Sequence, residues 1–333
     1  MRIPSHEQQW LTALNERVPL LTDEAKQLKN LEEGFQGECY FDQLFHLFGP
    51  KEVPYLDDIT LKHQNSVVQI DKLFLLNDTL YLIDTKAYHG IYRYDGRKWR
   101  GEKFSYNENI FYQLFRAQTV VENILEKKGL HVTTKSYLVF TEDDLSLAIP
   151  KEFSQNILQS HQLSEWIHAL SKQPIKNSNE QWQARCIEEL NLATIPRYRT
   201  WRTLSLPRAT HLKKGICCEN CHQYDLCSET YFFTCQNCGH RESKEKAYVR
   251  TICDCGTIFH DQELTIGLLR NFFGEILNEA YLQSVLRKHF LRTEKRGNAS
   301  SYINFGTPIY EWFEKKKEYF GNTEKRVHWE NRY

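Results

Sequence analysis

The sequence lacks three features that would assign a 333-residue protein to a functional class at once. Its 43 basic and 43 acidic residues cancel, so no overall field attracts it to nucleic acid and charge has to be interpreted locally. No run of about 18 apolar residues could span a bilayer, and residues 1–11 hold no apolar segment of signal-peptide length. Internal repeats and low-complexity tracts are missing as well. These absences favour a soluble, cytoplasmic protein of about two or three domains, without a membrane partner.

Cysteine, by contrast, is abundant and unevenly placed. Eight of the ten cysteines lie between residues 217 and 255. In an intracellular chain, closely spaced CxxC pairs bind metal more often than they form disulfides. Two such pairs, thirteen residues apart, predict a tetrahedral zinc ribbon with residues 231–233 as the strand entering the second pair. The predicted structural Zn²⁺ ligands are Cys218, Cys221, Cys235 and Cys238.

The register of the zinc ligands leaves alternatives. Cys217 could replace Cys218 in the first pair. A closed shell of four thiolates leaves no open position for catalysis, so the ribbon is expected to be a structural brace or a nucleic-acid module. A second, weaker pattern could form another metal site, although small buried cysteines are also common in protein cores. The spare donors near the ribbon are Cys227, His222 and His240, and the second pattern comprises Cys253, Cys255 and His260.

Charged residues interrupt a strand–turn–strand pattern at residues 67–86. Valine, isoleucine, leucine and tyrosine fill most of this segment, and an Asn-Asp pair supplies the turn. Alternation along the second strand places Asp84 and Lys86 on one face, and the turn brings Asp71 opposite Asp84. Two carboxylates and an ammonium group at one spot suit a hard divalent cation beside an activated water. The alternative is a surface salt bridge between Lys86 and either acid.

The flanking sequence extends this pattern in both directions. Gly37-Glu38 falls in an expected helix before the hairpin. After the hairpin, a Gly-x-x-Trp stretch and a second expected helix add further residues to the pattern. Over about residues 34–140 the chain therefore resembles the nuclease-related domain (NERD), a family of the PD-(D/E)XK nuclease superfamily. This resemblance implies an α/β, restriction-endonuclease-like fold, with a mixed β-sheet flanked by helices. The further matching positions are Gly96, Trp99, Asn109, Gln113 and Arg116.

The resemblance also implies a role for each of five residues. Asp71 and Asp84 would bind Mg²⁺ or Mn²⁺, and Glu38 would complete or hydrogen-bond the metal shell. Lys86 would orient or help deprotonate the attacking water and would stabilise charge on the scissile phosphate. Gln113 would position that lysine or the phosphate. Asp84 stands where many family members carry Glu, and the superfamily pattern allows either residue.

A basic linker precedes the cysteine cluster. Residues 195–215 contain no acid and six basic residues, with two aromatic residues interleaved. The linker is either a solvated connector or an arm that contacts phosphates. Its basic residues are Arg197, Arg199, Arg202, Arg208, Lys213 and Lys214.

The segment after the cysteine cluster suggests a helix-turn-helix. Residues 261–274 and 278–291 are amphipathic, with expected N-caps at Asp261 and Asn278 and a break near Gly274. Asn298 would then turn a small wing. The alternative is a helical hairpin packed on the ribbon with a solvated basic edge. The predicted nucleic-acid-binding residues are Arg287, Lys288 and Arg292.

These patterns together predict five segments and one leading function. The expected function is a Mg²⁺-dependent phosphodiester hydrolase acting on DNA, which the ribbon and the helical tail steer to its substrate. A ribbon followed by a helical tail also resembles the C-terminal extension of some bacterial NERD proteins. The alternatives are a non-catalytic nucleic-acid-binding protein and a protein-interaction adaptor that retain the nuclease-like scaffold. The expected segments are a helical lead-in at 1–33, the NERD domain at 34–150, a helical region and basic linker at 151–210, the zinc ribbon at 211–245 and a helix-turn-helix-like domain at 246–333.

Overall fold

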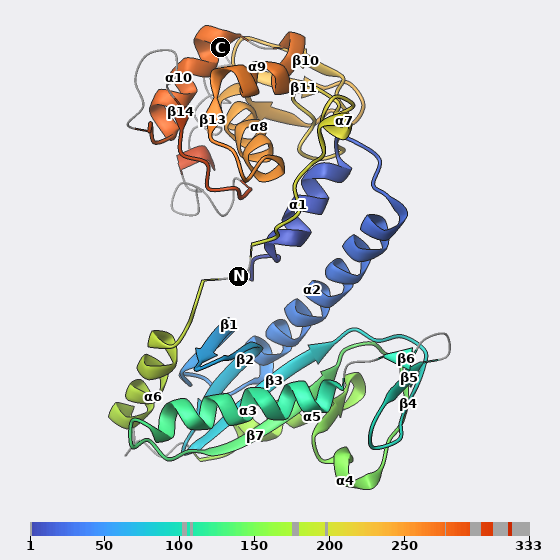
Figure 1. Cartoon of the computed structure of the whole chain (residues 1–333), viewed down its shortest axis with the longest axis vertical. Helices are drawn as coiled ribbons and strands as arrows, with labels where there is room; N and C mark the ends of the chain where they lie inside the picture. Colours follow the sequence, from blue (N-terminus) through green and yellow to red (C-terminus); the bar gives the residue numbers. More distant parts are fainter. Residues whose placement is uncertain are drawn as a thin grey trace. The chain divides into compact units, whose positions relative to one another are not determined.

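The chain forms two compact units by its internal contacts. Unit 1 comprises Met1–Arg2 and Lys29–Tyr198, and unit 2 comprises Ile3–Leu28 and Arg199–Tyr333 (Figure 1). No helix in the described ranges is both long and apolar enough to cross a bilayer. The five segments expected from the sequence remain predictions. The computed structural model describes residues 2–101, 105–106, 109–174, 180–196, 199–276, 278–293, 301–308 and 319–321.

Unit 1 is built on a five-stranded mixed sheet with the strand order β1-β2-β3-β7-β9. The first three strands form an antiparallel meander, and β7 and β9 continue the sheet in parallel. The expected turn joins β2 to β3, where Asn77 adopts a φ of 57° and Leu76 pairs with Thr79. The strands are β1 (Tyr55–His63), β2 (Ser66–Leu76), β3 (Thr79–Lys86), β7 (Thr133–Phe140) and β9 (Ile157–Gln159).

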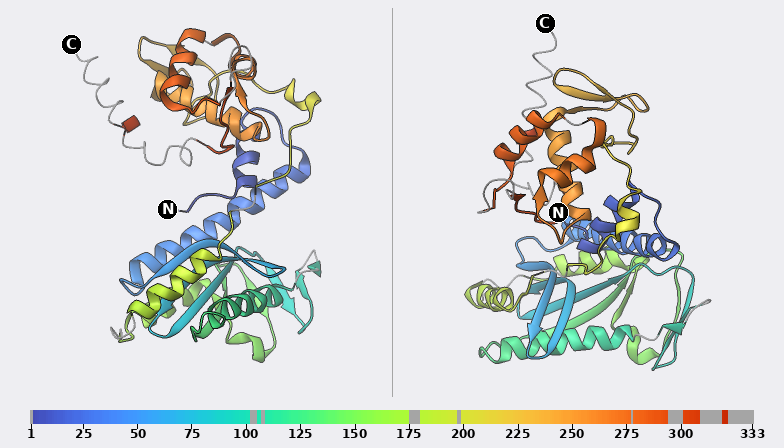
Figure 2. Two further views of the ribbon diagram at one scale, coloured as in Figure 1. Left: turned by 60° about the vertical axis from the view of Figure 1, so that its left-hand side comes forward. Right: turned by 45° about the horizontal axis from the view of Figure 1, so that its top comes forward.

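Helices cover both faces of this sheet, as the sequence predicts for an α/β domain. α3 lies along one face (Figure 2), where its apolar stripe packs with α6 on the leucines of β2 and β3. The part of α2 in unit 1 packs with α5 on the opposite face, against residues such as Phe74 and Ile83. The mixed α/β prediction is confirmed. The helices are α2 (Thr22–Phe48), α3 (Ile110–Glu126), α5 (Ser160–Ser171) and α6 (Glu180–Leu192).

A smaller four-stranded sheet, ordered β6-β5-β4-β8, completes unit 1. Buried Trp99 stacks on Tyr94 at 5.0 Å, and both contact Phe111 at the start of α3. Asn109 caps α3 by accepting from two main-chain N–H groups, and this aromatic cluster fixes where the helix begins. The elements are β4 (Ile91–Tyr94), β5 (Trp99–Gly101), β6 (Ser105–Tyr106), β8 (Ser146–Ala148) and the short helix α4 (Lys151–Ser154).

Unit 2 combines a small antiparallel sheet with a helical core. The sheet has the order β10-β11-β12, and β11 carries the expected strand into the second cysteine pair. α1 packs on α8, where the Trp10 indole N–H donates to Ile258 O at 3.2 Å. The elements are α1 (His6–Asn15), α7 (Leu206–Ala209), β10 (Leu226–Ser228), β11 (Phe232–Cys235), β12 (Arg241–Ser243) and α8 (Lys244–Ile258).

The C-terminal part of unit 2 is a helical tail that carries a two-stranded antiparallel sheet. Three helices are present in order, and β14 pairs with β13 and, through an isolated bridge, with Arg292. Asn278 caps α10 as predicted, and Gly274 ends α9 with a φ of 59°. The expected wing at Asn298 lies outside the described residues. The elements after α8 are β13 (Leu264–Thr265), α9 (Ile266–Phe273), η2 (Gly274–Ile276), α10 (Glu279–His289) and β14 (Ser301–Tyr302).

The predicted cap at Asp261 is wrong. The side chain of Thr265, not Asp261, caps α9 by accepting from Leu268 N at 3.1 Å. β13 occupies the preceding residues because they pair with β14, a contact between distant parts of the chain. A prediction based on local capping residues cannot include the pairing of β13 with β14, because these strands are far apart in the sequence.

Candidate functional site

Five residues predicted from the resemblance line one cavity of about 350 Å³ in unit 1. α2 contributes the first residue, β2 and β3 contribute the next three, and α3 contributes the last. The fold therefore gathers side chains that are up to 75 positions apart in the sequence. They are Glu38, Asp71, Asp84, Lys86 and Gln113.

The charged residues occupy the end of a sheet face that is otherwise apolar. The register pairs Lys72 with Ile83, so Asp71 is aligned with Asp84 at the next position. Alternate residues on the same face, such as Leu73 and Leu82, are buried beneath α3. The polar cluster thus begins where the apolar cover ends.

The hairpin residues form specific contacts. Lys86 Nζ donates to Asp84 Oδ1 at 2.5 Å, and both side chains are about four-fifths buried, at 18% and 22% exposure. Asp71 Oδ2 accepts from Thr85 N at 2.7 Å and from Thr85 Oγ1 at 2.9 Å. The pairing of Lys86 with an acid is therefore present, but it lies in a cavity instead of on an open surface.

Burial and crowding shift the ionisation of these groups. Burial raises the pKa of Glu38 to about 8, and repulsion from Asp71 adds to the shift. Burial and repulsion from Asp71 raise the pKa of Asp84 to about 6, against the attraction of Lys86. Burial alone would lower the pKa of Lys86, but Asp84 and Asp71 raise it above its ordinary value. Lys86 is consequently protonated at neutral pH.

A glycine allows Glu38 to reach this site. A Cβ atom on Gly37 would lie 2.7 Å from Thr141 Oγ1, so only glycine permits this close approach of α2 to the residue after β7. Thr141 N in turn donates to Lys86 O at 3.2 Å. The Gly-Glu pair of the sequence pattern therefore has a steric cause.

A charge network beside the cavity was not predicted from the sequence. Arg2 Nη1 lies 2.9 Å from Glu38 Oε2 and Arg2 Nε lies 2.6 Å from Asp42 Oδ2. Lys72 also lies 3.0 Å from Asp42 and contacts Asp57. No local pattern links residues as distant in sequence as Arg2 and Glu38. Thr85 was missed too, although its place inside the Asp-x-Lys motif was a usable signal.

The cavity holds oxygen donors of the type that a hard divalent cation prefers, although among the described residues no three of its acidic ligand atoms all lie within 4.8 Å of one another. Five carboxyl groups and three basic side chains make up the cluster, and burial together with repulsion from Asp71 raises the pKa values of two of the acids, Glu38 and Asp84. Carboxylate oxygens are the ligands that Mg²⁺ and Mn²⁺ prefer. A divalent cation at this cavity would offset the repulsion among the acids. The carboxylates are Glu38, Asp42, Asp57, Asp71 and Asp84, and the cations are Arg2, Lys72 and Lys86.

The four predicted thiol ligands also come together, in unit 2. The Sγ atoms of Cys218, Cys221, Cys235 and Cys238 all lie within 4.8 Å of one another. The amide of Asn237 donates to Cys221 Sγ at 3.5 Å and, with other hydrogen bonds, lowers the pKa of this thiol to about 6. Burial raises the pKa of Cys218 to about 12. Four sulfur donors at this spacing could bind a structural metal such as zinc.

The other cysteines lie outside this four-thiol cluster. Cys217 belongs to a separate group with Glu16 and His222, so it does not replace Cys218. Cys227 is exposed on β10. Cys253 and Cys255 are buried in α8, and no group of metal donors in the described part of the chain includes them or His260.

The predicted nucleic-acid-binding residues take different positions in unit 2. Arg287 and Lys288 are exposed on α10, and Lys288 Nζ lies 2.8 Å from Glu245 Oε1. Arg292 is exposed beyond the end of the helix, at the bridge to Tyr302. Of the linker residues, Arg197 lies outside the described ranges.

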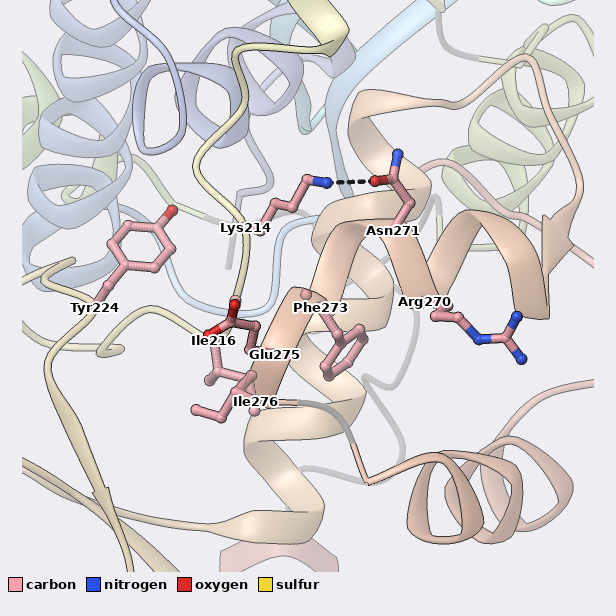
Figure 3. A pocket seen from close by; sticks show the side chains of 10 residues that line it. Lys214, Ile216, Tyr224, Arg270, Asn271, Phe273, Glu275 and Ile276 are labelled. Atoms are coloured by element: carbon pink, nitrogen blue, oxygen red, sulfur yellow. Dashed lines mark hydrogen bonds between the residues drawn. The ribbon is translucent and has the colours of Figure 1, made fainter.

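A larger cavity of about 710 Å³ lies in unit 2, beside α9 (Figure 3). Lys214 Nζ donates to Asn271 Oδ1 at 2.6 Å across it, and Arg270 pairs with Glu279 at 2.8 Å. It contains none of the residues predicted for catalysis or metal binding. Size alone therefore does not mark the functional site.

Comparison with known families supports the resemblance. The family model described as the nuclease-related domain, NERD, matches residues 33–141. Searches among curated proteins and solved structures give no significant match. The matched range contains all five residues that line the smaller cavity. Over these residues, the chain carries a nuclease-related domain of the NERD family.

Proposed function

We propose that the chain is a metal-dependent nuclease that hydrolyses phosphodiester bonds in DNA. The observation that carries the proposal is the convergence of Asp71, Asp84 and Lys86, with Glu38 beside them, on one cavity of a nuclease-related domain. A scaffold without catalysis has no need for several buried charges at that spot, because burying charge is costly.

The side chains have separate tasks in this proposal. Asp71 and Asp84 would hold Mg²⁺ or Mn²⁺ with Glu38 as a third carboxylate, and the bound ion would supply Lewis acidity and a water of lowered pKa. Thr85 fixes the orientation of the Asp71 carboxylate through two hydrogen bonds. Lys86, held on Asp84, would orient the attacking water and stabilise charge that develops on the phosphate. Because its pKa is raised, Lys86 is better suited to donating hydrogen bonds than to accepting a proton.

The wall opposite the hairpin would contact the substrate. Gln113 and Arg116 lie on α3 and line the cavity. Arg116 donates to Val67 O at 2.6 Å, and this hydrogen bond fixes its side chain near the start of β2. An amide and a guanidinium group suit phosphate oxygens, so Gln113 would position the scissile phosphate.

Unit 2 would supply a structural metal site and affinity for DNA. We propose that zinc occupies the four-thiol cluster, because hydrogen bonds to thiolate sulfur favour the ligating form. A helix-turn-helix made by α9 and α10 would suit duplex DNA, with α10 as the recognition helix. Arg287, on the exposed side of α10, would be a first phosphate or base contact.

The proposal is tested by cleavage of linear and circular DNA and RNA with Mg²⁺, Mn²⁺ or EDTA. Asp84→Asn and Lys86→Ala should each lower metal-dependent cleavage by at least about 10²-fold and leave nucleic-acid binding largely intact. Asp78→Asn is the matched control, since it alters an exposed acid in the turn at the other end of the same hairpin.

Three other results would each contradict the proposal. Equal cleavage by the wild type and both variants would refute the assigned site. Salt-dependent binding without any cleavage would favour a non-catalytic nucleic-acid-binding protein. Absence of nucleic-acid binding would favour a protein-interaction adaptor.

A further inference from the structure

We infer that Arg2 is a positioning residue of the proposed nuclease centre, which holds the Glu38 carboxylate and the main chain at Asp71 in place. This inference rests on the proposed function. It concerns a residue outside the region that the family model matches, residues 33–141.

The guanidinium group of Arg2 ties two elements of the site together. Nη1 lies 2.9 Å from Glu38 Oε2 on α2, and Nη2 donates to the main-chain oxygen of Asp71 on β2 at 2.6 Å. Nε donates to Asp42 Oδ2 at 2.6 Å. The planar, multiply donating guanidinium can satisfy these three directions at once, which an ammonium group on a flexible stem cannot.

The surroundings of Arg2 show that these contacts are built into the fold of unit 1. Its side chain is only 2% exposed, so its charge must be compensated by its partners. Glu38 and Asp42 are four residues apart on α2 and therefore share one face of the helix. Lys72, 3.0 Å from Asp42, anchors that second carboxylate from β2. Within the network, Glu38 is the cavity residue whose carboxylate contacts Arg2 directly.

Two possible roles of Arg2 predict opposite effects on metal affinity. If Arg2 acted only through its charge, its removal would leave the centre more negative, and a divalent cation would bind more tightly. If Arg2 positions Glu38, its removal frees the carboxylate and the cation binds more weakly. Partners that orient a metal ligand typically contribute about 10–100-fold to affinity or activity. The buried guanidinium contacts Glu38, Asp42 and the main chain at Asp71 at the same time, and this geometry favours the second role.

The test is titration of the full, zinc-loaded chain with Mn²⁺ by calorimetry, together with the Mn²⁺ dependence of DNA cleavage. Arg2→Ala should weaken Mn²⁺ binding by about 10–100-fold and raise the Mn²⁺ concentration for half-maximal cleavage by a similar factor. The rate at saturating Mn²⁺ should change much less, whereas a merely destabilised protein would lose maximal rate without this shift. Arg185→Ala, which removes an exposed guanidinium from α6 of the same unit, should match the wild type.

Arg2→Lys is a second variant in case the alanine variant misfolds. It keeps the positive charge but lacks the planar guanidinium group with its several donors. An intermediate Mn²⁺ affinity for Arg2→Lys would support positioning. Wild-type or tighter affinity for both Arg2 variants would overturn it while wild-type cleavage persists. Absence of cleavage by the wild type at every Mn²⁺ concentration would instead overturn the proposed function.

Discussion

The carboxylate cavity of unit 1 and the four-thiol cluster of unit 2 gather the side chains that we propose as metal ligands in opposite ways. The cavity takes its acids from α2, β2 and β3 and leaves an open volume of about 350 Å³ beside a lysine. The cluster takes all four donors from two short CxxC pairs and packs them within 4.8 Å of one another. An open set of oxygen donors leaves room for water and phosphate, whereas a closed set of sulfur donors leaves none.

The pKa shifts of the acids in the cavity also differ from those of the thiols in the cluster. Burial, together with repulsion from Asp71, raises the pKa values of Glu38 and Asp84, so the charged forms of both acids are disfavoured without a cation. In the four-thiol cluster the shifts have opposite signs, because hydrogen bonds lower the pKa of the Cys221 thiol and burial raises that of Cys218. The difference teaches that an open set of oxygen donors suits a metal that exchanges its ligands, whereas a closed set of thiols suits a permanently bound structural metal.

The largest expected effect comes from breaking the four-thiol cluster. Cys235→Ser should abolish zinc binding and loosen unit 2, because a structural zinc site contributes on the order of 10 kcal/mol to folding. Unit 1, which has its own cores, should stay folded. Metal analysis of reduced protein and limited proteolysis measure both outcomes.

Cys227→Ser is the matched control for this variant, since Cys227 is an exposed cysteine on the neighbouring strand β10. It should retain one zinc per chain. Reduced wild-type protein without zinc would contradict the assignment of the cluster.

The next effect concerns pH and the carboxylate cavity. The pKa of Asp84 is raised to about 6, so this acid is protonated below that pH and cannot act as a metal ligand. Glu38, whose pKa is raised to about 8, loses its charge at a higher pH than Asp84 does. Mn²⁺ affinity should therefore fall from about pH 8 downward, and it should fall by about a further tenfold per pH unit below about pH 6. Calorimetric titration between pH 5 and pH 8 measures this. A flat affinity across that range would show that Asp84 does not bind the ion.

A smaller effect is expected from the basic surface of unit 2. Changing Arg287, Lys288 and Arg292 together to alanine should lower the slope of log affinity against log salt by roughly 0.9 for each phosphate of duplex DNA that these side chains neutralise. Lys288 also pairs with Glu245, so its contribution should be the weakest within α10. Fluorescence anisotropy at several salt concentrations measures the slope. An unchanged slope would direct attention to Arg199 and Arg202 of the linker.

The smallest effect should come from the ion pair beneath α10. Hydrogen bonds from His289 and Lys288 lower the pKa of Glu245 to about 2, below its ordinary value of 4.5. The stabilisation is therefore present above about pH 4.5 and is lost as the pH falls toward 2. Glu245→Gln should cost about 1 kcal/mol at pH 7 and almost nothing near pH 2.

Glu279→Gln, which breaks the more exposed pair with Arg270, is the control for this comparison and should cost less. Thermal unfolding at both pH values distinguishes the variants. Equal losses of stability in Glu245→Gln and Glu279→Gln at pH 7 would show that the more buried ion pair does not contribute more than the exposed one.

The sequence predicts the two sites to different degrees because their residues are related differently. The cysteines of the cluster lie in two local pairs, so spacing predicts the cluster, whereas only the structure decides that Cys218 and not Cys217 belongs to it. The Asp71 and Asp84 alignment follows from a short hairpin whose turn fixes the register. Arg2 and the Asp42–Lys72 pair reach the site only through tertiary packing, and no local pattern encodes such contacts.

The most direct test of the account separates the two metals. Zinc-loaded protein is freed of Mg²⁺ by dialysis, and cleavage of linear and circular DNA is followed before and after Mg²⁺ is added back, with zinc content measured at each step. The account predicts no cleavage before the addition and cleavage after it, at constant zinc content. Cleavage of equal rate without Mg²⁺ would contradict the claim that the carboxylate cavity is the catalytic centre and the four-thiol cluster a brace.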